Sequence, residues 1–456
     1  MNVRRWQLLV VSLLIPAGSA LGQTRLSLRV AVDRALAQNP SLRAAEEVQQ
    51  AAQARSRQAR AGWWPRVDVQ QGFTRGDNPI YVFGAKLTQR QFAAQDFALP
   101  LLNAPPPLDN FQTRLTGQAL LFDSGRTHYQ VQQASRFAAS AAEQTEEQRQ
   151  SLIAEVMRTY YDWLVALAEQ EAASEAVASA QANVERARNL EQAGLVVSAD
   201  RMSAEVFLAQ MQDRLIRARN QVELARLALA RLTGIPPSSI GEPADQFSAP
   251  IAISESVEQW VATALAHRPL LQATRAAADA AAAALKLARA QFGPTLGLYA
   301  SFERDALTLG GPSGTNWLAG VQLNWNLFAG GGDRAALQEA QARYRASTYQ
   351  LDWVRSGIEL EVRQAFLNLQ AAAQRVNATR DAVAQAEESL RIIQNRYAAG
   401  LVPITELLRA QAARLDARTN YAAALHDWHV ARMDLERAAG LLTPGSPLIP
   451  VPGAQP

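Results

Sequence analysis

The sequence predicts a mainly α-helical protein with four β-strands, in which one module built around a long helix occurs twice. Three observations carry this prediction. A run without proline extends from Leu108 to Ile235, and no glycine lies between Gly125 and Gly194. One helix over that stretch is about 100 Å long at about 1.5 Å per residue, far beyond an ordinary globular helix. The pattern recurs later in the chain, and residues 317–327 alternate between an apolar face and a face that is polar or small apart from Leu318.

The repeat has a constant offset. The Leu-Phe-x-x-Gly segment that ends at Gly125 recurs at Gly331 (331 − 125 = 206), and the Ala-Gly-Leu-Val segment around Gly194 recurs at Gly400 (400 − 194 = 206). No gap is needed between these anchors. A repeat of this length decides the architecture before any local assignment.

A pair of similar segments upstream of these anchors has a different offset. Residues 36–42 resemble residues 265–271, with Pro40 equivalent to Pro269 (269 − 40 = 229). The first copy therefore holds 23 extra residues (229 − 206 = 23) between Pro65 and Phe122. The predicted organisation is a first structural repeat at 23–234, a linker at 235–250, a second structural repeat at 251–442 and a proline-rich disordered tail at 443–456.

Residues 1–22 are typical of a secretory signal peptide. Arg4 and Arg5 are the basic end, 8–15 is the apolar core, and Ala20-Leu21-Gly22 is a small-x-small cleavage site. The alternative, an N-terminal membrane anchor, requires a longer apolar run. The chain has no cysteine, so we expect neither a disulfide nor a lipid anchor. Its mixed charges, with a net charge of +3, do not favour nucleic acid as a partner.

The elements of the first copy are predicted from the positions of glycine and proline and from the hydrophobic periodicity. Ser198 or Asp200 is expected to cap the returning helix, which ends near Gly234. The expected elements are helices at 26–38 and 40–61, a strand at 67–73, a loop at 76–108, a strand at 111–121, the long helix after Gly125 and the returning helix.

The second copy repeats this order. The expected elements are helices at 255–267 and 269–291, strands at 296–302 and 317–327, the long helix to Gly400 and a returning helix at 404–439. Within this long helix, apolar residues step by four and three, which predicts a left-handed supercoil against a neighbouring helix. This predicted seam consists of Ile358, Val362, Ala365, Leu369, Ala372 and Val376.

The strands suit a transmembrane barrel. In residues 317–327 one face is apolar from Trp317 to Leu327, and the other carries Gln322, Asn324 and Asn326. Such a strand fits lipid outside and water inside. A half-buried strand of a soluble sheet is the alternative, but the flanking helices are too long for a soluble sandwich. Four strands cannot close a barrel alone, so several copies must pool them.

Other patterns carry weaker chemistry. His426 and His429 are more typical of a solvated helix face than of a metal site, because no third ligand follows at helical spacing. The 330–332 glycines lack the Lys-Ser/Thr of a phosphate loop. Asp77-Asn78-Pro79 with Asp96 fits turn chemistry better than a cation site. No catalytic triad or carboxylate pair stands out, so we expect no enzyme, no cofactor and no metal.

The chain resembles the TolC-type outer-membrane efflux proteins over roughly residues 26–442. The resemblance lies in segments 36–42 and 265–271, the two Leu-Phe-x-x-Gly junctions and the two Ala-Gly-Leu-Val turns. It implies a homotrimer with a 12-stranded barrel in outer-membrane lipid and a periplasmic α-barrel. It also implies a passive exit duct of a tripartite efflux or type I secretion system, docked by a periplasmic adaptor and powered by an inner-membrane pump.

The alternative function is a periplasmic coiled-coil adaptor or envelope-spacing scaffold. An adaptor is expected to carry a β-rich module between its helical arms, whereas these strands come as amphipathic pairs.

The resemblance also implies site residues. Glu406 matches the first acid that narrows the family's periplasmic mouth, but Arg409 stands where a second acid is usual, and Val402 where an arginine sometimes occurs. Glu406 is equally consistent with a plain helix-terminal acid. The implied constriction comprises Glu406, Arg409, Tyr397 and Asp200. The implied adaptor-docking turns comprise Gly194, Leu195, Val196, Gly400, Leu401 and Val402, and the strand-to-helix junctions Phe122, Gly125, Phe328 and Gly331.

Overall fold

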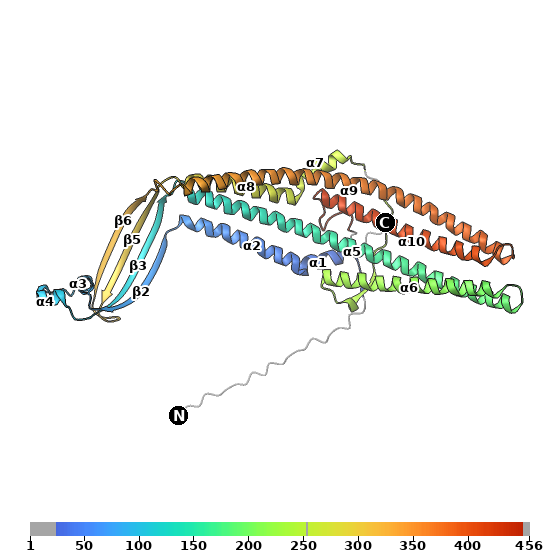
Figure 1. The fold of residues 1–456 in the computed structure, drawn as a ribbon, viewed down its shortest axis with the longest axis horizontal. Helices are drawn as coiled ribbons and strands as arrows, with labels where there is room; N and C mark the ends of the chain where they lie inside the picture. Colours follow the sequence, from blue (N-terminus) through green and yellow to red (C-terminus); the bar gives the residue numbers. More distant parts are fainter. Residues whose placement is uncertain (1–23, 252–253, 450–456) are drawn as a thin grey trace, which may run out of the picture.

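The computed structural model describes residues 24–251 and 254–449. The predicted signal peptide at 1–22 lies outside the described residues. A four-stranded sheet occupies one end of the elongated molecule, and two helical hairpins end together at the other (Figure 1). The predicted fold class is confirmed for the single chain: long duplicated helical hairpins joined to four strands.

The sheet is antiparallel in the order β2 (Arg66–Gly76), β3 (Leu108–Phe122), β5 (Thr295–Ala306) and β6 (Ser313–Asn324). Its register gathers apolar side chains on one face, because Val69, Leu115, Phe302 and Trp317 form one row across all four strands. On the other face Arg114 pairs with Glu303 at 2.8 Å. The fourth strand begins and ends earlier than the predicted 317–327, at Ser313 and Asn324, so Trp325 and Leu327 follow its end.

The helices follow the predicted order. The first copy contains α1 (Leu28–Gln38), α2 (Pro40–Arg60), η1 (Ala61–Trp63), α5 (Arg126–Gln192) and α6 (Ser198–Thr233). The second contains α7 (Val257–His267), α8 (Pro269–Ala290), α9 (Gly332–Ala398) and α10 (Ile404–Ala438). Helices α5 and α9 each have 67 residues, which gives a length of about 100 Å at about 1.5 Å per residue.

The two copies close in the same way. Pro40 and Pro269 each start a helix, where the missing N–H costs little. The residue before each proline donates to the end of that copy's returning helix: Asn39 to the Leu232 carbonyl at 3.1 Å, and Arg268 to the Arg437 carbonyl. Arg268 is 2% exposed and also pairs with two glutamates.

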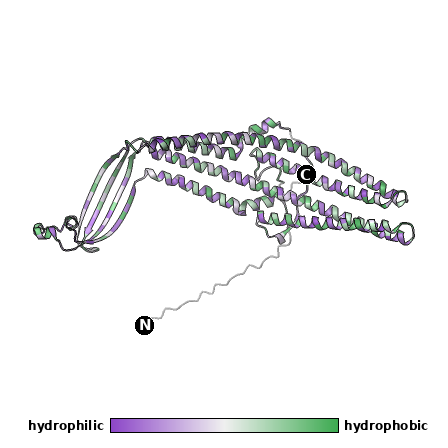
Figure 2. Ribbon diagram, viewed as in Figure 1, coloured by the Kyte–Doolittle hydropathy of each residue, from purple (hydrophilic) through white to green (hydrophobic). Residues whose placement is uncertain are grey.

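Each chain is one slab that is four elements wide along its length (Figure 1). Next to the sheet the helices lie in the order α2, α5, α8, α9, and towards the tips in the order α6, α5, α10, α9. Hydrophobic and hydrophilic residues are interleaved along the long helices (Figure 2). None of the described helices is long and apolar enough to cross a membrane.

The predicted seam of α9 is confirmed. All six of its residues are buried, and they form a core cluster with side chains of α8 and α10 such as Leu271 and Trp428. The seam therefore packs against α8 near the sheet and against α10 further along. The repeat period of three and four residues matches helices that pack side by side along their length.

The expected loop at 76–108 was wrong. It contains α3 (Pro79–Thr88), η2 (Ala94–Phe97) and α4 (Leu99–Asn103) at the far end of the sheet (Figure 1). The Asn78 side chain caps α3 by accepting from the backbone N–H groups of Ile80 and Tyr81. Asp96 is engaged by Lys86 at 2.7 Å. The extra residues of the first copy thus form a small helical insertion between β2 and β3.

Two other expectations need correction. The 235–250 segment is not a bare linker, because it holds η3 (Pro237–Ser239) and β4 (Ile240–Pro243), which pairs in parallel with β1 (Thr24–Leu26). The tail is not disordered over residues 443–449, where Ile449 is 2% exposed and packs into the core. Residues 450–456 lie outside the described residues.

The predicted cap of α6 was also wrong. Its N-cap is Val197, whose side chain makes no capping bond, so Ser198 is the first helical residue and Asp200 lies in the first turn. The turn that precedes α6 places Val197 at the cap position, one residue ahead of the side chains that can cap.

We expect Leu369→Ala to destabilise the chain by roughly 2–5 kcal/mol, because Leu369 is 1% exposed in the seam and its truncation leaves a cavity. Leu401→Ala is the matched control: Leu401 is 67% exposed, so the same truncation should cost within about 0.5 kcal/mol. Denaturant unfolding followed by circular dichroism measures both. Equal effects of the two variants would contradict the assigned seam.

Candidate functional site at the helix tips

The two helical turns at the tips have the same geometry. Gly194 and Gly400 adopt left-handed φ values of 69° and 74°, which glycine tolerates best. The next residue in each turn donates back into the preceding helix, Leu195 to the Leu190 carbonyl and Leu401 to the Arg396 carbonyl, both at 2.9 Å. This is a Schellman motif, which ends a helix and satisfies its last carbonyls.

The predicted docking residues therefore lie together at one end of the molecule. Leu195 is 71% exposed and Leu401 67% exposed, whereas Val196 and Val402 are half-buried. Each tip thus presents an exposed leucine on a hydrogen-bonded turn, and the first tip also exposes Val197.

Glu406 and Arg409 are in contact. The Arg409 guanidinium donates to the Glu406 carboxylate at 2.7 Å, one turn apart in α10 of the same chain. Glu406 also lies in the first turn of α10, where the helix dipole favours an acid. Both side chains are largely exposed, so the pair itself adds about 1 kcal/mol at most to stability.

Tyr397 and Asp200 bring the two hairpins together. Tyr397, in the last turn of α9, is half-buried against an apolar cluster that includes Phe207 of α6 and Leu408 of α10. Burial raises the pKa of the Tyr397 hydroxyl, the charge of Arg186 lowers it, and the charge of Asp200 raises it. The predicted constriction residues therefore belong to one tip region that both copies build.

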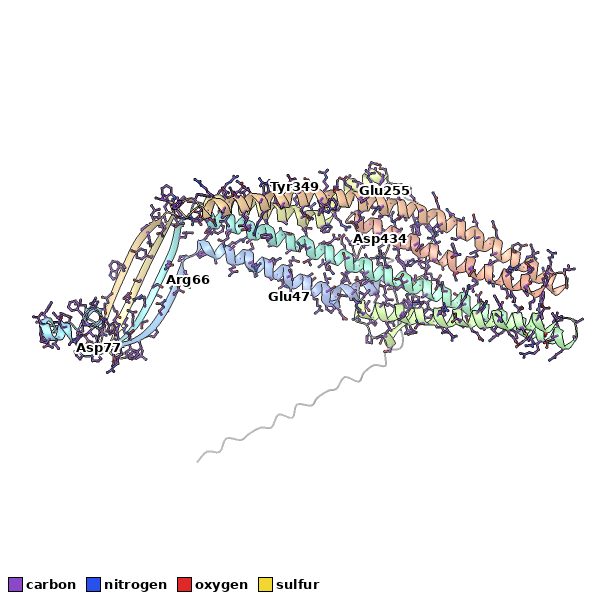
Figure 3. All side chains as sticks on the ribbon, in the orientation of Figure 1. Glu47, Arg66, Asp77, Glu255, Tyr349 and Asp434 are labelled. Atoms are coloured by element: carbon purple, nitrogen blue, oxygen red, sulfur yellow. The ribbon has the colours of Figure 1, made fainter. Side chains whose placement is uncertain are left out.

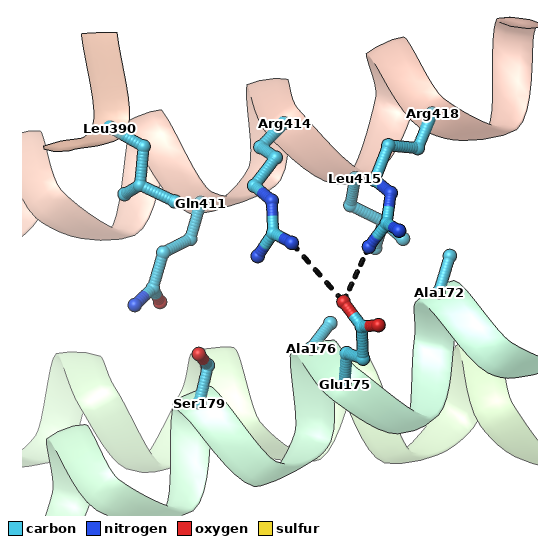
Figure 4. A pocket seen from close by; sticks show the side chains of 9 residues that line it. All are labelled: Ala172, Glu175, Ala176, Ser179, Leu390, Gln411, Arg414, Leu415 and Arg418. Carbon is cyan, nitrogen blue, oxygen red and sulfur yellow. Dashed lines mark hydrogen bonds and ion pairs between the residues drawn. The ribbon is translucent and has the colours of Figure 1, made fainter. Parts of the chain in front are cut away.

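Sequence reasoning missed the polar contacts that join the hairpins. The Glu175 carboxylate of α5 accepts from Arg414 at 3.2 Å and from Arg418, both in α10 (Figure 4). Asn183 of α5 donates to Gln411 of α10 at 2.8 Å. These partners are more than two hundred residues apart in sequence, so no local pattern pairs them.

A second set of contacts that sequence reasoning missed stabilises the turn between α5 and α6. Arg201 donates to Glu191 at 2.7 Å and to Glu205 at 2.8 Å, which bridges the end of α5 and the start of α6. Its spacing of four residues to Glu205 is a signal that helical periodicity can supply.

The predicted junction residues lie where strands become helices. Gly125 and Gly331 are the N-caps of α5 and α9, with φ of 86° and 88°. Phe122 is 53% and Phe328 86% exposed. Arg126, which prediction missed, donates to the Gln291 carbonyl at 2.9 Å and the Gly293 carbonyl at 2.7 Å, and so joins the start of α5 to the end of α8.

The two histidines of α10 do not form a solvated helix face. His429 is 6% exposed, its ring contacts those of Tyr161 and Phe247 at centroid distances of 4.9 and 5.4 Å, and its Nε2 atom lies 3.2 Å from the Ser248 carbonyl oxygen. The His426 ring bonds Asp162 at 2.8 Å. Among the described residues, no group of three or more His, Asp or Glu side chains is placed to hold a metal ion.

Burial lowers the pKa of His429 to about 4 from its ordinary value of 6.5. Between these two pH values the His429 imidazole binds a proton in the unfolded chain but stays neutral in the folded chain. Stability is therefore lost as pH falls from about 6.5 to about 4, by about 3 kcal/mol at about 1.4 kcal/mol per unit.

We expect His429→Phe, which keeps an aromatic ring in contact with Tyr161 and Phe247, to reduce this acid-induced loss. Urea unfolding at pH 7 and pH 4.5 measures it. His267→Phe is the control, because His267 is exposed in α7. An unchanged pH dependence in His429→Phe would contradict the neutral buried imidazole.

Comparison with known proteins gives a consistent picture. The family model described as "Outer membrane efflux protein" matches residues 31–235 and 260–441. The proteases secretion protein PrtF of Dickeya chrysanthemi is 26% identical, over 96% of this chain and 93% of its own. Protein CyaE of Bordetella pertussis is 28% identical, over 71% of this chain and 69% of its own.

Solved structures share the fold. A membrane protein from Pseudomonas aeruginosa superposes with a TM-score of 0.78 at 22% identity, covering 91% of this chain and 93% of its own. The outer membrane protein VceC from Vibrio cholerae superposes with a TM-score of 0.76 at 24% identity, covering 91% and 96%.

Proposed function

The chain belongs to the outer membrane efflux protein family, and on that premise we propose that three copies form one passive duct through the outer membrane and across the periplasm. It is an outer-membrane transport protein with a periplasmic portion. We assign the sheet to the membrane and the long hairpins to the periplasm.

The observation that carries this proposal is that the slab has two open edges. Within the described residues, β2 and β6 each pair with a single strand. Long unpaired strand edges recruit another chain. The α9 edge carries a second, exposed apolar row at seven-residue spacing, Trp353, Leu360 and Leu367, which are 74%, 57% and 63% exposed. Figure 3 shows Tyr349 on the same helix.

The two edges differ: one carries β2 and α6, the other β6 and α9. The first edge of one copy can therefore pair with the second edge of the next copy. Such a head-to-tail contact closes into a ring when the rotation allows it. The opposite edge also exposes apolar side chains, nearer the tips, on α6: Met202, Val206 and Ile216 are each more than half exposed.

The strand number favours three copies. Two copies give a barrel of about 8 strands, whose interior side chains fill, whereas three give about 12 strands around a wider passage. The polar face of the sheet then lines the passage, and the row of Val69, Leu115, Phe302 and Trp317 faces lipid. The family is a channel class, and we assign the chain no catalytic role.

The tips then form the periplasmic mouth. Three-fold symmetry brings copies of Glu406, Arg409, Tyr397 and Asp200 around one axis, where they act as the constriction. The two exposed turns at Gly194–Val196 and Gly400–Val402 are the docking points for a periplasmic adaptor, which links the duct to an inner-membrane pump. We propose efflux or type I secretion as the process, because relatives are named for efflux and for protease secretion. The family match favours this duct over a periplasmic adaptor or spacing rod.

The mass of the protein in mild detergent should equal about three chains. Leu360→Glu with Leu367→Glu should lower the temperature at which the assembly dissociates, because each buried leucine contributes about 2 kcal/mol to an interface. Leu309→Glu is the control, since Leu309 is 74% exposed on the β5–β6 turn. A stable monomer in the wild type would overturn the proposed duct.

Charge at the mouth should set ion selectivity. Glu406→Gln removes the acid ring and should lower cation selectivity in planar bilayers. Arg409→Ala frees Glu406 from its 2.7 Å partner and should raise it. Arg391→Ala, which breaks a similar exposed ion pair with Glu388 within α9, is the control. Unchanged selectivity in both tip variants would remove these residues from the pore.

A further inference from the structure

The helical insertion α3–η2–α4 (79–103) is fastened to one face of the sheet. Gln89, 2% exposed, donates from Nε2 to the Asp109 carbonyl at 2.8 Å and to Asn110 Oδ1 at 2.9 Å. Asn110 in turn donates to Asp305, which is fully buried, at 2.8 Å. Asp305 lies two residues after Glu303 and therefore on the same polar face of the sheet. The insertion is thus fastened over the polar face.

A second set of contacts reaches the opposite edge of the sheet. Asn316 of β6 donates to the Thr88 carbonyl at 3.2 Å, and Arg90 donates to the Thr315 carbonyl at 2.7 Å. A Cβ atom at Gly314 would lie 1.9 Å from the Thr88 carbonyl oxygen, so only glycine allows this approach. The insertion leaves β2 and contacts β3, β5 and β6, and therefore crosses the whole end of the sheet.

The insertion also exposes apolar side chains in the single chain, although the Phe97 ring contacts the edge of Phe92 at 5.1 Å between centroids. Ile80 is 86% exposed, Leu99 72% and Phe97 64%. Lys86 and Asp96 pair with each other, and Arg90 is bound to β6, so these charges do not oppose an apolar contact. Apolar side chains gathered on so short a segment are typical of a contact surface.

We propose that the three insertions pack against one another through these apolar residues and plug the outer mouth of the duct. The proposal rests on the proposed trimer, in which the polar face lines the lumen. Twelve strands about 4.8 Å apart and tilted by about 40° give a barrel radius of roughly 12 Å. Helix α3 has 10 residues, about 15 Å, which is comparable to this radius, so insertions seated over the polar faces of three sheets are large enough to meet across the lumen. Outer-leaflet lipid would face the other side of the sheet.

Single cysteines test the plug directly, because the chain has none of its own. Ile80→Cys, Phe97→Cys and Leu99→Cys are made separately in the full chain and oxidised mildly in the detergent-solubilised assembly. A disulfide needs Cα atoms within about 7 Å. At least one variant should give covalent dimers, and one cysteine per chain leaves the third copy free. Leu309→Cys, equally exposed on the β5–β6 turn, should stay unlinked.

The close approach of the Thr88 carbonyl to Gly314 supplies a second test. Gly314→Ala should reduce the cross-linking severalfold, because it pushes the insertion off β6. Gly72→Ala, on the same face with nothing within 4 Å of its Cβ atom, should leave it unchanged.

The outcomes separate the two proposals. An assembly of three chains in which none of the three cysteines cross-links overturns the plug and leaves the duct intact. Quenching of a fluorophore at Leu99→Cys by brominated lipid chains would instead assign the surface to lipid, and would equally overturn the plug. A protein that is not a trimer removes the proposed function itself.

Discussion

The fold depends on two helices that run without a break from the sheet to the tips. Neither α5 nor α9 contains an interior proline, and α9 buries one continuous seam from Ile358 to Val376. Because the seam keeps a spacing of three and four residues, α8 and α10 can use it in turn. The shorter helices are positioned by these two long ones, and the strand order of the sheet is continued by the helix order behind it.

The edges of the slab carry the functional consequence. In the described residues, β2 and β6 have no strand partner on their outer sides, so most N–H and C=O groups along these two edges lack a ladder partner within one chain. The same two edges continue down the helices as exposed apolar rows. In the proposed duct the sheet and the tips are two ends of one association surface, so a change at the edge affects both.

Repetition made most of the fold predictable. The constant offset placed both long helices and both turns, and the seam emerged from spacing alone. The sequence did not reveal α3 and α4, because their apolar residues lie among prolines and turn signals, and the contacts of Phe92 with Phe83 and Phe97 form only once the insertion has folded. It did not reveal β1 and β4, because three- and four-residue strands far apart in sequence have no periodicity of their own. At the tips the Glu406–Arg409 contact follows from helical spacing, whereas the Glu175 contacts with Arg414 and Arg418 need the hairpins to be placed first.

The unbroken helices also make each chain a lever. The junction at Asp123–Arg126, where Arg126 ties α5 to the end of α8, lies about 100 Å from the tip turns at about 1.5 Å per residue. A pivot of about 5° there moves the tip by roughly 9 Å over that length. Small angular changes next to the sheet thus become larger displacements at the tips. Conversely, force applied at the tips acts on the junction with the full length of the arm.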